Sequence, residues 1–347
     1  MNSLKKNDRI AFIDALKALA CLLIINSHCS DLYPSSLMAL GGGQGNAIFL
    51  IVTGFLCADI KLPWWKWIAK RYCRLIPVTL MICVTDLMIC ALLGTPQTNI
   101  IFYCINSYWF VWALAIYYIP YYLIFKSKEK TRIKLLSMAY LTGYVLLYIL
   151  QMNESALFVE AEGFSLFKVY FYFAPMILGG VIAYFVFGEK DRCSDSVIKT
   201  RLARPGVLMI AAIIGLSAWG LEYACVTLFR TAFKWQFIIN IGNIVFCVCL
   251  FCALLAGFNS HSVEKLGQSK LMKMLSMCTL EIYLVQILIK RFFLSLGFPA
   301  NAILYFVLSI GLGVTLHKTS KGIPKLMTGN KFRITIGKPS GNRRKVK

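Results

Sequence analysis

Apolar stretches of about 18 residues or more recur along the whole chain, separated by short charged segments. An α-helix rises about 1.5 Å per residue, so a stretch of this length spans the hydrocarbon core of a bilayer. Lipid cannot satisfy exposed backbone donors and acceptors, which favours helices for such segments. The sequence therefore predicts an all-α fold, a polytopic transmembrane helical bundle.

The composition fits one membrane domain. Charged residues make up 15% of the 347 residues and hydrophobic residues 59%, whereas soluble domains carry about 25% charged residues. Residues 1–317 are therefore predicted to form a single transmembrane domain. Residues 318–347 are rich in basic residues and contain Gly and Pro, so we expect a flexible cytoplasmic tail that is attracted to anionic lipid.

A window of about 19 residues predicts about ten spans. They cover residues 10–26, 43–60, 75–93, 101–125, 135–151, 166–187, 206–225, 237–258, 275–294 and 300–316.

The basic residues indicate how these spans are oriented. Most of the 37 Lys and Arg residues lie at the N-terminus, in every second loop and in the tail, as expected for cytoplasmic segments. Both termini are therefore predicted to be cytoplasmic. Lys290 and Arg291 are an exception, because they fall on the expected outer side between the last two spans.

Two classes of partner are disfavoured. The net charge of +22 is spread between apolar runs instead of forming one stripe with aromatic residues, which argues against nucleic-acid binding. The 13 cysteines lie mostly within apolar runs, where they behave as small hydrophobic residues, so no metal site is expected.

The first span and its immediate flank carry three residues that could do chemistry, because ionisable groups are costly inside a membrane. Asp14 and Lys17 lie on it, and His28 lies two residues past its predicted end. Lys17 and His28 are 11 residues apart, which puts both on one helix face, about 16 Å apart along the axis. A neutral imidazole could remove a proton from a hydroxyl that attacks a thioester, which makes His28 a candidate general base. The alternative is a structural histidine that caps the helix. Lys17 could steady an anionic donor or neutralise Asp14.

Arg71 and Arg74 precede the third predicted span. Arginines three residues apart share a helix face and present planar donor forks that suit phosphate oxygens. An acyl donor that carries a nucleotide would supply such oxygens on the cytoplasmic side. The alternative is that both arginines only contribute to the positive charge of a cytoplasmic segment.

Two other spans contain polar residues. Thr53 and Gly54 lie in the second span, where a glycine beside a hydroxyl residue favours close helix packing. Glu281 and Gln286 lie in the ninth span, five residues apart and therefore on offset faces. A buried Glu281 requires a partner that the sequence does not identify.

Together, these segments resemble the integral membrane acyltransferase 3 family over most of the chain. Asp14, Lys17 and His28 resemble the family's opening Asp-x-x-Arg element and its following histidine. The other similar elements are Thr53 to Phe55, Arg71 and Arg74 with Pro77, Tyr108 to Phe110 with Tyr117, Tyr118 and Pro120, and Ile282 to Gln286. Lys17 replaces the family's arginine and loses its planar fork, and Gln286 replaces a late histidine, which removes a second possible base.

The resemblance implies an O-acyltransferase of the bacterial plasma membrane, commonly one that O-acetylates surface polysaccharides. Acetyl-CoA would bind from the cytoplasm with its phosphates near Arg71 and Arg74. Its thioester would reach toward His28, with Lys17 and Asp14 as further catalytic candidates. We expect the glycan hydroxyl to attack directly, because no Ser or Cys forms an evident activated pair with His28, and an acyl-enzyme intermediate is the alternative.

The acceptor glycan would approach from the outer side. The candidate residues for binding it are Trp109, Tyr283 and Glu281. Two other functions remain open at this point. A bundle with few charges inside the membrane also suits an exporter of a lipid-linked polysaccharide, and the chain could instead be a non-catalytic partner of a glycan synthase.

Overall fold

The computed structural model describes residues 11–127, 129–151, 165–187, 204–229, 235, 237–257, 265 and 269–322. Within these ranges the chain is helical and has no strand, which confirms the predicted fold class. The long helices are α1 (Ala11–Ser27), α2 (Gly42–Cys57), α3 (Trp64–Leu92), α4 (Ile100–Ser107), α5 (Trp109–Phe125), α6 (Lys130–Gln151), α7 (Leu166–Phe187), α9 (Pro205–Phe229), α10 (Phe237–Ala256), α12 (Lys270–Ile289) and α13 (Ala300–Ser320). Two short 3₁₀ helices are η1 (Ser36–Met38) and η4 (Lys290–Phe293).

Eight of the described helices are long and apolar enough to cross a membrane, or nine if the bent pair α4 and α5 counts as one span. The remaining predicted span corresponds to α1, which has only 17 residues. The protein is therefore a multi-pass membrane protein. The predicted basic tail lies outside the described residues beyond residue 322.

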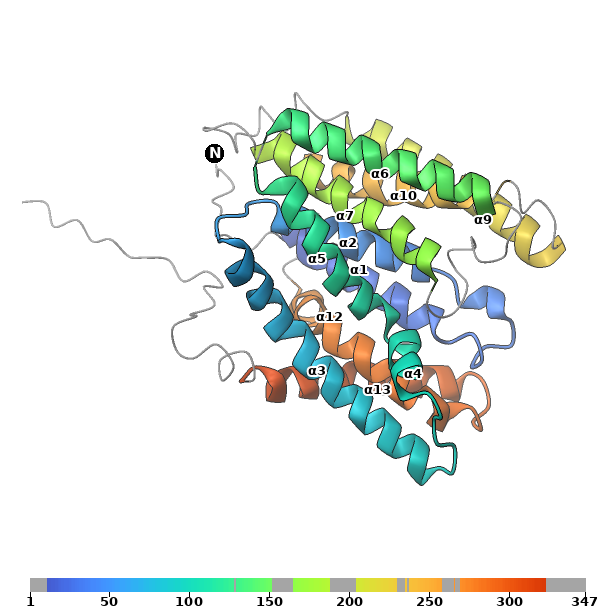
Figure 1. The fold of residues 1–347 in the computed structure, drawn as a ribbon. Coiled ribbons are helices and arrows are strands. Elements are labelled where there is room, and N and C mark those ends of the chain that lie inside the picture. Colours follow the sequence, from blue (N-terminus) through green and yellow to red (C-terminus); the bar gives the residue numbers. More distant parts are fainter. Residues whose placement is uncertain are drawn as a thin grey trace, which may run out of the picture.

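The helices form three groups in Figure 1. Helices α6, α9 and α10 lie on one side of the bundle, and α3, α12 and α13 lie on the other, with α1, α2 and α5 between them. Helix α12 packs against α1, α3 and α13, and α2 packs against α1, α7 and α10. Much of α6 and α9 is exposed on its outer face, as expected for helices that contact lipid.

Close packing between α2 and α7 depends on glycine. A Cβ atom at Gly54 would lie 2.0 Å from the backbone oxygen of Met176, and one at Gly179 would lie 2.0 Å from that of Ile51. The Tyr121 hydroxyl of α5 donates a 2.6 Å hydrogen bond to the Gly54 carbonyl. The expectation of close helix packing at Gly54 is therefore confirmed.

Two predicted boundaries were wrong. Helix α3 begins at Trp64 and not near residue 75, because the segment assigned to a cytoplasmic loop continues the helix. The span predicted for residues 101–125 is broken at Tyr108 into α4 and α5, which meet at 81°. A hydropathy window detects neither feature. The charged first turns of α3 lower the mean hydropathy of the window, and a bend within an apolar segment does not change it.

Replacing Gly54 by Ala should destabilise the bundle by about 1–3 kcal/mol, because the backbones of α2 and α7 must separate to admit the methyl group. The thermal-unfolding midpoint of detergent-purified protein measures the effect. The matched control is Gly311→Ala on α13, where an added Cβ meets no atom within 4 Å. Equal midpoints for the two variants would contradict the packing argument.

Candidate active site

His28 lies in the turn directly after α1, and its backbone N–H donates to the Ile25 carbonyl at 3.2 Å. Its partly buried ring meets Tyr283 of α12 edge to face, with 6.4 Å between the ring centroids. The side chain of Asn26 fixes the chain that follows, because its amide nitrogen donates to the carbonyls of Met38 and Leu40. The imidazole therefore faces a neighbouring helix.

An aromatic wall extends from His28 into the bundle. Phe110 of α5 packs on Tyr283 with 5.8 Å between centroids, and Trp109 lies next to it. The Lys168 ammonium of α7 stands 4.3 Å from the centre of the Trp109 ring, which is a cation–π contact. The structure thus brings together three of the predicted site residues, His28, Tyr283 and Trp109.

Two lysines, Lys290 and Lys168, place positive charge near His28. Lys290 forms a 2.7 Å ion pair with Asp31, three residues after the histidine, and this hydrogen bond lowers the pKa of Asp31 below its usual value. Burial, followed by the charges of Lys290 and Lys168, lowers the pKa of His28 to about 4. The imidazole is therefore neutral near pH 7, which is the form that accepts a proton.

Arg71 and Arg74 do not form one symmetric pair. The Arg71 guanidinium stacks 3.5 Å above the Trp67 ring and donates to the Trp67 carbonyl and to the Cys57 sulfur. Arg74 is half exposed and lies 3.8 Å from the Glu281 carboxylate. Both arginines are near Tyr118 of α5, so they remain on the same side of the bundle.

Glu281 has two basic neighbours and lies away from His28. Its carboxylate is buried and accepts a 2.9 Å hydrogen bond from Nδ1 of His317, with the ring proton assigned to that nitrogen. The same carboxylate is also near Arg74. Glu281 and Tyr283 are two residues apart on α12, so their side chains leave the helix in nearly opposite directions. We therefore group Glu281 with the arginines and not with the aromatic wall.

Asp14 contacts a different part of α12 from His28. The Ser276 hydroxyl donates a 2.6 Å hydrogen bond to the buried Asp14 carboxylate. Lys17 is partly buried and is close enough to Cys278 of α12 for its charge to interact with that thiol. The structure therefore does not place either residue beside the imidazole.

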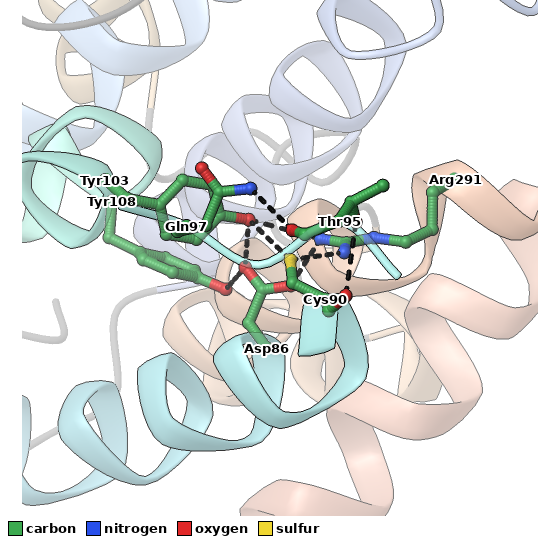
Figure 2. Close-up of polar contacts among 7 residues, drawn as sticks. All are labelled: Asp86, Cys90, Thr95, Gln97, Tyr103, Tyr108 and Arg291. Atoms are coloured by element: carbon green, nitrogen blue, oxygen red, sulfur yellow. Dashed lines mark hydrogen bonds and ion pairs between the residues drawn. The ribbon is translucent and has the colours of Figure 1, made fainter. Parts of the chain in front are cut away.

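A buried ion pair lies at the end of α3 and was missed in the sequence. Arg291 of η4 pairs with Asp86, whose side chain has no solvent exposure (Figure 2). The same carboxylate accepts hydrogen bonds from the hydroxyls of Tyr103, at 2.8 Å, and Tyr108, at 3.2 Å. An aspartate inside an apolar stretch was the available signal, and the pairing explains why Arg291 lies at an end expected to be poor in basic residues.

Comparison with known proteins identifies the family. A family model for the acyltransferase 3 family, described as an acyltransferase domain, matches residues 10–317. The chain belongs to this family and is a membrane acyltransferase. No curated protein and no solved structure matches the chain. The membership favours an acyltransferase over an exporter, and O-acetylation of surface polysaccharides stays a prediction.

Replacing Glu281 by Gln should lower stability by about 1–3 kcal/mol, because a buried carboxylate that joins α3, α12 and α13 through Arg74 and His317 loses its charge. Arg74→Gln should cost less, since the Arg74 side chain is 51% exposed and water screens its interaction. Thermal-unfolding midpoints of the two purified variants test this order. A larger loss for Arg74→Gln would contradict it.

Proposed function

We propose that this protein transfers an acyl group, in the first instance acetyl, from a cytoplasmic acyl-CoA to a hydroxyl of a cell-surface or lipid-linked glycan. The observation that carries the proposal is the orientation of His28, whose neutral imidazole faces the aromatic wall of Tyr283, Phe110 and Trp109. An imidazole directed into lipid could not accept a proton from a glycan hydroxyl.

Donor binding is assigned to Arg71 and Arg74. Their guanidinium groups supply donors for the phosphate oxygens of coenzyme A. We assign this end of the bundle to the cytoplasmic side of a bacterial plasma membrane, and the positive-inside distribution of Lys and Arg supports the cytoplasmic assignment. Arg74 is half exposed and can be reached by a soluble donor.

Helix α5 connects the donor region to His28. Tyr118 lies beside Arg71, and Phe110, eight residues earlier, packs on Tyr283. Eight residues correspond to about 12 Å along a helix axis. The flexible arm of coenzyme A, which ends in the thioester, would need to cover this distance along α5.

The reaction is direct attack on the thioester. The sugar oxygen forms a bond to the acyl carbon, the carbon–sulfur bond breaks, and His28 takes the hydroxyl proton and returns it to the departing coenzyme A thiolate. Trp109 and Tyr283 give the sugar an apolar and aromatic surface to pack on. Asp14, Lys17 and Glu281 would support the bundle around the donor without contacting the reacting atoms.

His28→Asn should reduce transfer at least about 100-fold, because the amide cannot act as the base. Purified protein, acetyl-CoA labelled in the acetyl group and glycan extracted from cells lacking this protein would be assayed for free coenzyme A and for labelled glycan. The two products should form in equal amounts with the wild type. Binding of labelled acetyl-CoA to His28→Asn should be unchanged and serves as the folding control. A variant that transfers at the wild-type rate would contradict the assignment.

The pH dependence of transfer tests the charge environment of His28. With a pKa of about 4, the acidic limb of kcat/KM should lie well below the ordinary histidine value. Lys290→Gln removes a positive charge that opposes protonation of the imidazole, so the limb should move to higher pH. Rates measured between pH 4 and 7 decide this. A wild-type limb near 6.5, or no movement in the variant, would contradict the proposal.

A further inference from the structure

The bend between α4 and α5 has no helix-breaking residue of its own. Sharp kinks usually arise at proline or glycine, and residues 100–109 contain neither. Tyr103 belongs to α4 and Tyr108 is the junction residue, yet both hydroxyls donate to the same oxygen of Asp86. One carboxylate of α3 therefore holds both α4 and the junction residue of the bend (Figure 2).

The carboxylate is itself fixed by η4, which directly follows α12. Arg291 binds the other oxygen of Asp86 and also donates to the Cys90 sulfur and the Tyr103 hydroxyl. Asp86 is fully buried and Arg291 is largely buried, so the pair is protected from water and its geometry is sensitive to the loss of either member.

The residues that directly follow the bend form the wall of the candidate active site. Trp109 and Phe110 come after Tyr108, and Phe110 packs on Tyr283, which packs on His28. A rotation of α5 at Tyr108 would move this wall away from the imidazole. Asp86 is linked to this wall by its hydrogen bond to Tyr108, the residue before Trp109.

The neighbouring cation, Lys290, links the same region to the chain that follows His28. Lys290, next to Arg291, pairs with Asp31 in the chain that follows His28. The adjacent pair Lys290 and Arg291 therefore holds the chain after His28 on one side and, through Asp86, the α4–α5 bend on the other.

We propose that Asp86, held by Arg291, is a positioning residue that sets the angle between α4 and α5 and so places Trp109 and Phe110 against the catalytic histidine. This inference rests on the proposed function of the His28 site. It assigns Asp86 an effect on turnover and none on donor binding, because the arginines that would bind the donor lie elsewhere on α3.

The test compares four variants in the transfer assay with acetyl-CoA and the extracted glycan. Asp86→Asn keeps the shape and removes the charge, and kcat should fall about 100-fold while the affinity for labelled acetyl-CoA is unchanged. Asp86→Glu keeps the charge and should recover part of the activity. Tyr108→Phe removes only the hydroxyl of the junction residue and should lower kcat several-fold. This variant keeps the test valid if Asp86→Asn does not fold. The matched control is Thr95→Val, since the Thr95 hydroxyl bonds only to the Cys90 carbonyl among the residues in Figure 2.

The outcomes separate this inference from the proposed function. Wild-type kcat in both Asp86→Asn and Tyr108→Phe would overturn the positioning role while leaving His28 as the base. Equal losses of kcat and donor affinity, with no recovery in Asp86→Glu, would also overturn it, because they indicate only general damage to the fold. If the wild type releases no coenzyme A, or His28→Asn retains activity, the proposed function itself fails.

Discussion

Charged side chains inside a membrane bundle are tolerated only where another helix supplies a partner, and this constraint fixes α12 in its place. Asp14 of α1 meets Ser276, Arg74 of α3 and His317 of α13 meet Glu281, and the cations that follow α12 meet Asp31 and Asp86. Each contact joins α12, or η4 directly after it, to a different part of the bundle. The relative positions of α1, α3 and α13 therefore depend on polar contacts along one helix.

The geometry of the candidate active site depends on these contacts. His28 follows α1 and Tyr283 belongs to α12, so the packing of these two helices brings the imidazole and the phenol ring together. The aromatic wall comes from α5, whose start is held by Asp86 through Tyr108. The proposed donor region lies on α3, where Arg74 is near Glu281 of α12.

The sequence was sufficient to predict the fold class and the packing role of Gly54, and it named three residues that the structure brings together, His28, Tyr283 and Trp109. Long apolar stretches allow only a few structures in lipid, and a histidine beside a membrane span is rare enough to attract attention. The bend at Tyr108 could not be predicted, because the segment contains neither proline nor glycine and the carboxylate that binds Tyr108 lies 22 residues earlier in the chain. The partners of Glu281 were equally hidden, since His317 lies 36 residues away and contacts it only through the antiparallel packing of α12 and α13. Arg71 and Arg74 share a helix face as expected, but the stacking of Arg71 on Trp67 gives the two guanidinium groups different neighbours.

The central claim is that a thioester supported by the arginines of α3 meets the imidazole that follows α1. An experimental structure with a non-hydrolysable acetyl-CoA analogue tests this most directly. We expect the nucleotide phosphates to contact Arg71 or Arg74, and the atom that replaces the thioester sulfur to lie within about 4 Å of the His28 ring. An analogue bound with its phosphates elsewhere, or with its acyl end separated from His28 by the aromatic wall, would contradict the account.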